Sequence, residues 1–195
     1  MFDSITGQPI LSNGGAGLSN KGSAFVEGLL QHLPGLMGLT MPTVNSFRRV
    51  GPGCWTGSQV GWALEDKECG VRVCSDLATQ EWSHVEVKFV DSTCNIYLAL
   101  AGLLSSGLDG VVQELNLRPS LDDAGTEDET TETTSPLPAN VMEALEALEN
   151  DAHLMNLMSP TMSKAYLAVR KHDAESSVSS GTTLQDEVHA AYQRS

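Results

Sequence analysis

The chain has 195 residues, which is enough for one domain with a real core, since 41% of its residues are hydrophobic although only 5% are aromatic. Its 25 Asp and Glu residues outnumber its 11 Lys and Arg residues, and the formal net charge of −14 would repel nucleic acid and anionic membranes. No apolar stretch approaches the ~20 residues that a membrane span needs. We therefore expect neither nucleic acid nor a membrane as a partner.

The cysteines indicate a reducing compartment. Cys54, Cys69, Cys74 and Cys94 form no Cys-x-x-Cys pair and show no metal-finger spacing. Nothing before Ser23 combines a basic segment with an apolar run, as a secretory signal would. These observations predict four reduced thiols in a soluble, cytoplasmic protein.

The amino-terminal part is predicted to be a loop followed by helix. Residues 1–22 are rich in Gly, Ser and Asn, and they end in a sequence at 18–20 that is typical of the approach to a helix cap. The apolar spacing predicts a helix from Ser23 to Leu33. Pro34 either ends this helix or starts a second short one over residues 36–39.

Residues 42–57 carry Pro, Gly and Asn at positions that predict an ordered loop rather than a strand. The loop contains two adjacent arginines, Arg48 and Arg49. Two alternatives remain open for them: they clamp an anion, or they are solvated side chains.

Three short strand-like runs follow and suggest a small antiparallel meander: residues 59–64, 70–74 and 84–90. In the last run, strict alternation places His84, Glu86 and Lys88 on one face and apolar residues on the other. A histidine, a carboxylate and an ammonium spaced about 7 Å apart along a strand can bind a cation and an anion together. The alternative is the polar solvent face of an antiparallel sheet.

A helix predicted over residues 95–109, capped by Asn95 or Thr93, is apolar on nearly all sides, so we expect it to be buried in the core. Residues 121–136 are dominated by Asp, Glu, Thr and Ser and are predicted to be an acidic, flexible insertion. This divides the chain into a main part, residues 1–120, and carboxyl-terminal helices of the same domain at 137–195.

The carboxyl-terminal helices are amphipathic. The first is predicted to bury Val141, Leu145 and Leu148. A second is predicted over Thr161 to Glu175, and the sequence allows a last one at 182–192. The inward residues expected for the second are Met162, Tyr166 and Val169.

Several motifs, in order and spacing, resemble the glutamine synthetase family: Pro42-Thr43-Val44-Asn45-Ser46-Phe47-Arg48-Arg49, Glu86 in Val-Glu-Val-Lys-Phe, Asn95-Ile96-Tyr97-Leu98-Ala99-Leu100-Ala101, and Gly107-Leu108-Asp109-Gly110. The similarity runs from about Gly17 to Gly110 and more weakly over 141–169. It implies an α+β fold, a partial glutamine-synthetase-type catalytic domain with a curved antiparallel sheet and packed helices. In the family this sheet holds ATP, divalent metals and glutamate, and γ-glutamyl phosphate forms there and is attacked by an amine.

The resemblance implies roles for single residues. Glu86 matches the metal-binding glutamate nearest the ATP phosphates, and a hard carboxylate suits Mg²⁺ or Mn²⁺. Arg49 matches the arginine for the glutamate carboxylate, and Lys88 stands where the family usually has another arginine for that substrate. Arg72 and Lys67 match positions whose side chains bind the nucleotide phosphates in the family. Lys67 again stands in place of an arginine, so the bidentate geometry of a guanidinium is lost there.

Two departures from the family are larger. His84 replaces an arginine that contacts nucleotide phosphate. Trp55, within Pro52-Gly53-Cys54-Trp55-Thr56-Gly57, occupies the flap position where glutamine synthetases place the glutamate that deprotonates ammonium, so no catalytic base is assigned. This motif resembles the branch related to plant nodulins and fungal developmental regulators. Two alternatives remain open for Trp55: it covers an amine bulkier than ammonia, or it is a packing residue. Packing is favoured, because Trp makes a good lid without taking part in the chemistry.

The family's Glu-x-Glu and His-x-His metal strands, and its amino-terminal domain, would precede the matched region. Because hard divalent cations want six or more ligands, Glu86 alone cannot hold the family's metals. We expect a glutamine-synthetase-like ligase part that is inactive as this chain alone, with glutamate and an amine as family substrates and a homo-oligomer if full length. The alternative is a non-catalytic protein that acts by self-association or by docking to full-length subunits.

Overall fold

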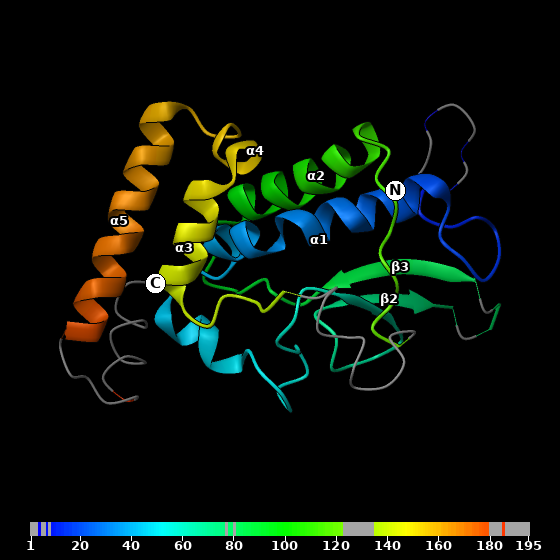
Figure 1. The fold of residues 1–195 in the computed structure, drawn as a ribbon, viewed down its shortest axis with the longest axis horizontal. Helices are drawn as coiled ribbons and strands as arrows, with labels where there is room; N and C mark the ends of the chain where they lie inside the picture. The colour runs from blue at the N-terminus through cyan, green and yellow to red at the C-terminus, as the bar shows by residue number, and fades with distance from the viewer. Residues whose placement is uncertain are drawn as a thin grey trace.

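The computed structural model describes residues 9–76, 78–79, 81–122 and 135–179, with the single positions 4, 7 and 185. Most of the predicted acidic insertion and of the predicted helix at 182–192 lie outside the described residues. Figure 1 shows the elements in chain order: α1 (Asn20–Thr40), the 3₁₀ helix η1 (Val44–Arg49), β1 (Trp62–Leu64), β2 (Val71–Ser75), β3 (Trp82–Val87), α2 (Ile96–Val112), α3 (Val141–Asn150), α4 (Ala152–Met155) and α5 (Pro160–Ser179).

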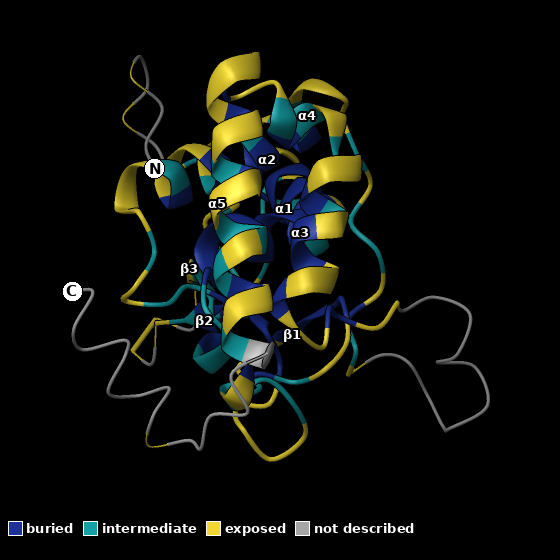
Figure 2. Ribbon diagram, turned by 90° about the vertical axis from the view of Figure 1, so that its left-hand side faces the viewer, coloured by how far each residue is buried: buried dark blue, intermediate teal, exposed yellow. Residues whose placement is uncertain are grey.

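Helix α1 is the centre of the molecule. Figure 2 shows it as the most deeply buried helix, with α2 and α3 beside it, and Figure 1 shows the strands on the side of α1 away from α2. The predicted cap is confirmed, because the Ser19 side chain accepts a hydrogen bond from the Gly22 amide at 2.9 Å. None of the helices among these residues is both long and apolar enough to cross a bilayer.

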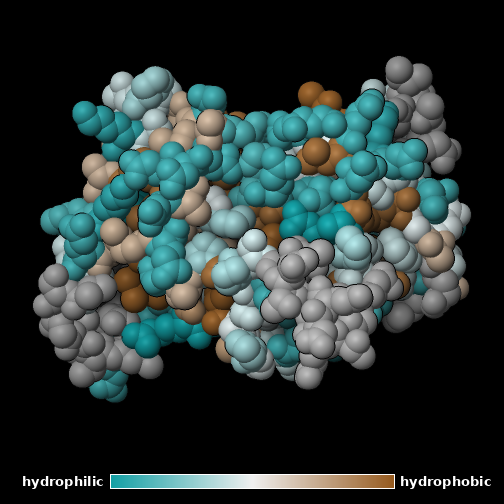
Figure 3. Space-filling model, viewed as in Figure 1, coloured by the Kyte–Doolittle hydropathy of each residue, from teal (hydrophilic) through white to brown (hydrophobic). Residues whose placement is uncertain are grey.

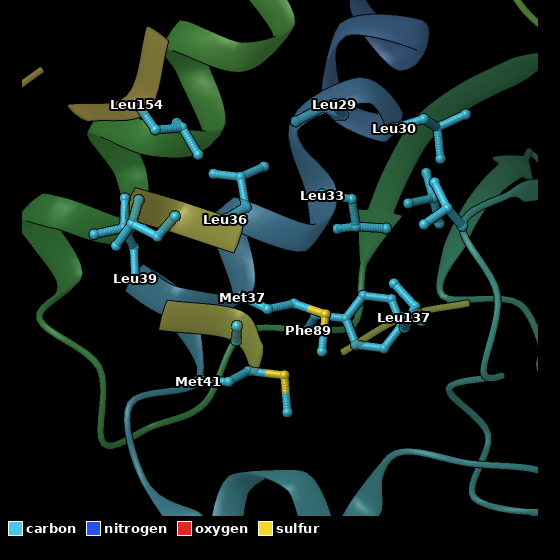
Figure 4. Packing of buried hydrophobic residues seen from close by; sticks show 14 of the residues in the cluster. Leu29, Leu30, Leu33, Leu36, Met37, Leu39, Met41, Phe89, Leu137 and Leu154 are labelled. Atoms are coloured by element: carbon cyan, nitrogen blue, oxygen red, sulfur yellow. The ribbon is translucent and has the colours of Figure 1, made fainter. Parts of the chain in front are cut away.

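Pro34 lies inside α1, so the expectation that it ends or restarts the helix is wrong. Proline removes one backbone hydrogen bond and costs a helix interior about 3 kcal/mol. On both sides of it, however, the helix buries large apolar side chains that fill the core drawn in Figure 4, which include Leu30, Leu33, Leu36 and Met37. Burial of a single such side chain contributes about 1.5–3 kcal/mol, so packing outweighs the local penalty.

The three strands form a sheet of order β1-β2-β3. Strands β2 and β3 are antiparallel, as expected, but β1 runs parallel to β2, so the predicted meander is wrong at its first connection. The chain turns at Glu65, whose φ is +59°, and returns through residues 66–70 to the starting end of β1. Parallel strands usually need a connection of a dozen or more residues. The connection here can be shorter because β1 has only three residues and the chain has little distance to return.

Helix α2 begins at the predicted cap, since Asn95 Oδ1 accepts from the Tyr97 and Leu98 amides. The expectation that it is buried on all sides is wrong. Only its small residues, such as Gly102, Gly107 and Gly110, are buried against α1. Figure 3 shows separate hydrophobic side chains over α2 at the upper edge of the molecule, among hydrophilic ones. The large apolar residues of α2 that are exposed are Ile96, Tyr97, Leu100, Leu104, Leu108 and Val112.

The carboxyl-terminal helices differ in how well the pattern predicted their inner faces. In α3, the predicted residues Val141, Leu145 and Leu148 are all buried. In α5, Met162 and Val169 are exposed, so that part of the prediction is wrong, whereas Tyr166 packs against the core. The actual inner face is shifted around the helix, because Tyr166 Oη donates to the Gly38 carbonyl at 2.8 Å and fixes which side turns inward: Ser163, Leu167 and Ala174.

Candidate functional site

The antiparallel pair β2/β3 sorts its side chains by face. The register pairs Arg72 with Glu86, and the next pair on that face is Cys74 with His84. The alternation predicted for β3 is therefore confirmed, and Lys88 follows directly after the strand. The residues that alternate with these belong to the core or pack against it: Val71, Val73, Val85 and Val87.

Arg72 and Glu86 form an ion pair across the two strands, with Nε and Oε2 2.9 Å apart. Both atoms are buried, and apart from this ion pair neither has a hydrogen-bond partner. The guanidinium already faces this oxygen, and a carboxylate has further lone pairs that can bind a cation. Among the described residues, no cluster with the spacing of metal ligands includes Glu86.

The neighbouring groups are also charged or polar. Glu65, from the β1–β2 turn, accepts hydrogen bonds from the amide and the hydroxyl of Ser75 at 2.5 and 2.8 Å. These bonds lower the pKa of the Glu65 carboxyl, and the nearby Arg72 and His84 add to the effect. His84 is exposed, with Nδ1 2.8 Å from the Ser83 hydroxyl. This sheet face therefore presents anionic and basic groups side by side.

Arg49 has a structural task beside this face. Its Nη1 donates to the Lys88 carbonyl at 2.8 Å and its Nη2 to the Val90 carbonyl at 3.1 Å. The solvated alternative is therefore wrong for Arg49, which connects η1 to the end of β3. Its neighbour Arg48 is exposed and donates to Asn45 Oδ1 at 3.2 Å.

We expect Arg49→Lys to lower the free energy of unfolding by about 1–2 kcal/mol, because one ammonium cannot reproduce two divergent bonds from a planar guanidinium. Urea denaturation followed by circular dichroism measures the change. The matched variant Arg48→Lys, on an exposed side chain, is expected to change stability by less than about 0.5 kcal/mol. Equal effects for both variants would contradict the structural task of Arg49.

The loop 51–57, predicted from the resemblance to be the flap and called the flap below, is closed at its base by a bridge between Gly51 and Gly57. Gly53 N donates to Glu68 Oε2 at 3.1 Å, which connects the flap to the β1–β2 turn. At the tip, Trp55 has a left-handed φ of +59° and is 66% exposed. The interpretation of Trp55 as a packing residue is therefore wrong for this structure, and the indole is presented to solvent.

The two lysines lie between the flap and the sheet. Lys67 Nζ lies 6.0 Å from the centroid of the Trp55 ring, within cation–π range. Lys88 Nζ donates to the Lys67 carbonyl. The structure thus brings the predicted lysines together, with Trp55 beside them.

All four cysteines carry free thiols. Cys54 is exposed on the flap, whereas Cys69 and Cys74 are buried. Burial raises the pKa of the Cys69 thiol to about 11 and also raises that of Cys74.

A second polar cluster was missed by the sequence reasoning. His32 of α1, Asp109 of α2 and His153 of α4 converge, with Asp151 behind His32. Burial lowers the pKa of His32, but its hydrogen bonds to the two carboxylates outweigh burial and raise it overall. Positions so far apart show no motif spacing, and the only available signal was Asp109 in the Gly-Leu-Asp-Gly motif.

A comparison with known families decides the classification: the model of the glutamine synthetase catalytic domain matches residues 3–188. The chain belongs to the glutamine synthetase family. Relatives include a type-1 glutamine synthetase of Dictyostelium discoideum, 32% identical over 161 residues, which are 82% of this chain and 32% of the relative. The gamma-glutamylpolyamine synthetase GlnA3 of Streptomyces coelicolor is 32% identical over 169 residues, 82% of this chain and 36% of the relative.

Protein fluG of Emericella nidulans is 31% identical over 164 residues, which are 80% of this chain and 18% of that protein. Two solved structures confirm the α+β fold of this glutamine synthetase-family chain. A novel glutamine synthase homolog gives a TM-score of 0.74 at 28% identity, and a GmaS/ADP complex gives 0.73 at 25%. They cover 96% and 93% of this chain, and the chain covers 42% of each. The chain thus spans about a third of the first two curated relatives.

Proposed function

We propose that this chain contributes one wall of an ATP-dependent glutamate–amine ligase site and has no ligase activity by itself. The observation that carries the proposal is the Arg72–Glu86 pair, in which a guanidinium and a carboxylate face each other across two strands on a sheet face that also carries His84. Two relatives support the chemistry: one is named as a gamma-glutamylpolyamine synthetase, and one was solved as an ADP complex.

The roles follow from charge and position. Glu86 would supply one oxygen to Mg²⁺ or Mn²⁺, which when bound neutralises charge on the phosphates. Arg72, Lys67 and His84 would contact nucleotide phosphate as fixed or titratable donors. The substrate carboxylate would be bound by Lys88 and by those N–H groups of Arg49 that do not donate to main-chain carbonyls.

Inactivity of the chain alone follows from the ligand set. Mg²⁺ demands six ligands in near-octahedral geometry, and among the described residues Glu86 has no second carboxylate or imidazole placed to share a metal with it. The exposed Trp55 supplies no base at the flap. We infer that a complete site takes further protein ligands from outside the described residues.

The test is γ-glutamyl hydroxamate formation from glutamate, hydroxylamine, ATP and Mg²⁺. We expect none from the chain alone, and product when it is mixed with the separately expressed portion of the Dictyostelium relative that precedes the matched region. Glu86→Ala should lower the reconstituted rate by about 100-fold or more, since a metal ligand is lost. Glu81→Ala, exposed just before β3, is the matched control. Activity from the chain alone, or reconstituted activity indifferent to Glu86, would refute the proposal.

A second candidate is a non-catalytic role in docking to full-length glutamine synthetase subunits. The apolar outer face of α2 favours it, because contiguous exposed apolar surface marks interaction sites. The double substitution Leu100→Lys and Leu104→Lys should abolish co-elution with a full-length relative in size-exclusion chromatography while leaving Tm unchanged. Met162→Lys, on exposed α5 surface, should leave co-elution intact. Co-elution that survives the double substitution would exclude this face.

A further inference from the structure

A shallow, open hollow of about 510 Å³ lies where α1, α2, the end of α3 and the start of α4 meet, away from the strands. Its walls carry the second polar cluster: His32, Asp109, Asp151 and His153. His32 is only 6% exposed, so three helices bring two imidazoles and two carboxylates together in a largely buried place. Neither the Arg72–Glu86 pair nor the flap contributes to it.

The candidate ligand atoms of His32, Asp109 and His153 all lie within 4.8 Å of one another, and two of the contacts are much shorter. His32 Nε2 lies 3.2 Å from Asp109 Oδ2, and His153 Nδ1 lies 3.4 Å from Asp109 Oδ1. Tetrahedral zinc with bonds near 2.0–2.1 Å separates neighbouring ligand atoms by about 3.3 Å. Without an ion, the same two contacts are a hydrogen bond between His32 and Asp109 and an ion pair between His153 and Asp109. The two imidazole centroids are 4.8 Å apart, close to the roughly 5 Å expected for two rings on one ion.

The nitrogens on the outer side of both rings are already held. His32 Nδ1 lies 2.7 Å from Asp151 Oδ2, and the same carboxylate accepts from the Leu154 amide through Oδ1. His153 Nε2 lies 2.8 Å from the Ser105 hydroxyl. Outer partners of this kind fix the ring orientation of metal-binding histidines and leave the other nitrogen to face the ion.

We propose that His32 Nε2, His153 Nδ1 and an Asp109 carboxylate oxygen form a binding site for Zn²⁺, distinct from the proposed ligase wall. Two imidazoles with one carboxylate suit zinc, whereas Mg²⁺ prefers oxygen ligands. Because His32, Asp109 and His153 line the open hollow, water has access to complete the coordination. Because the ligands come from α1, α2 and α4, bound zinc cross-links these helices and stabilises the fold.

The test uses the full chain without a polyhistidine tag, stripped with EDTA and reduced with a non-chelating phosphine. The stripped chain is then saturated with Zn²⁺ and desalted. The zinc that it retains is measured by mass spectrometry, and its Tm is measured by differential scanning fluorimetry. We expect one Zn²⁺ per chain and a rise in Tm of a few degrees at saturating Zn²⁺ that equimolar Mg²⁺ does not produce. Asp109→Asn and His153→Gln should weaken zinc binding at least tenfold. His172→Gln, an exposed histidine of α5, should not.

His153→Gln is the decisive variant, because its side chain is 31% exposed and the fold tolerates its replacement, as circular dichroism will verify. Co²⁺ serves as a second probe: visible absorption of a tetrahedral site, without a thiolate charge-transfer band, excludes binding at the four cysteines. The proposal is overturned if the unaltered chain retains no zinc, or if His153→Gln retains zinc as well as the unaltered chain does. Neither readout requires ligase activity, so this proposal stands or falls apart from the proposed function.

Discussion

Gly28→Ala is expected to lower the free energy of unfolding by about 3 kcal/mol. A Cβ at this position of α1 would lie 2.3 Å from the Ser106 carbonyl oxygen and 2.7 Å from the Gly110 amide nitrogen. These are backbone atoms of α2, so no side chain can turn aside and the two helices must separate. Overpacking of a close-packed interior typically costs 1–3 kcal/mol, and a rigid obstacle places this variant at the upper end.

Urea denaturation measures this loss, and two further variants define its cause. Gly110→Ala approaches the same crossing from α2, with its Cβ 2.0 Å from the Ala24 carbonyl oxygen, and should cost as much. Gly15→Ala meets nothing closer than 3.6 Å and should change stability by less than about 0.5 kcal/mol. If Gly28→Ala were as mild as Gly15→Ala, the close crossing of α1 and α2 would be refuted.

The second large effect is expected from Glu27→Ala. Glu27 on α1 accepts from the Arg118 guanidinium through Nε and Nη2, and from the Arg118 amide at 3.0 Å. The Arg118 carbonyl in turn accepts from Trp62 Nε1 at 2.9 Å, which connects the helix layer to β1. Removing the carboxylate leaves a partly buried guanidinium and an amide without their acceptor, at a cost of about 2 kcal/mol.

The expected loss of unfolding free energy is kept to this value because the Arg118 side chain is 26% exposed, so water can replace part of the lost hydrogen bonding. Thermal unfolding in low and high salt is the measurement, and Glu146→Ala on the exposed face of α3 is the control. A loss for Glu27→Ala no greater than that for Glu146→Ala would show that the connection between α1 and β1 lies elsewhere.

Local patterns in the sequence predicted the elements that depend on local physics. The caps at Ser19 and Asn95 follow from side-chain oxygens that reach nearby amides, and the alternation from His84 onward follows from the pleat of a strand. The family motifs carried the fold as a whole, since the catalytic-domain match covers residues 3–188.

Features that depend on partners distant in the sequence could not be predicted in this way. The parallel pairing of β1 depends on where the chain returns after Glu65, and periodicity does not encode that path. The near-continuous apolar character of α2 could not distinguish a core helix from one that packs by its glycines and presents its leucines to solvent.

The candidate site was predicted in part. The residue types on the β2/β3 face followed from alternation and motif, but the cross-strand pairing of Arg72 with Glu86 required the register. Arg49 showed no local sign that its guanidinium binds main-chain carbonyls 39 and 41 residues away. His32 and His153 are 121 positions apart, and only the packing of three helices makes them neighbours.

The four thiols differ in exposure, and the exposed thiol of Cys54 lies on the flap, where a dye can be attached to it. The thiolate is the form of cysteine that attacks alkylating reagents. The buried Cys69, with a pKa of about 11, stays almost wholly protonated at neutral pH and is shielded from such reagents. Cys54 is exposed at the tip of the loop, one position before Trp55. A limiting amount of a thiol-reactive dye will therefore label Cys54 first, and quenching of the dye by the adjacent indole will report any change in the conformation of this loop without an engineered cysteine.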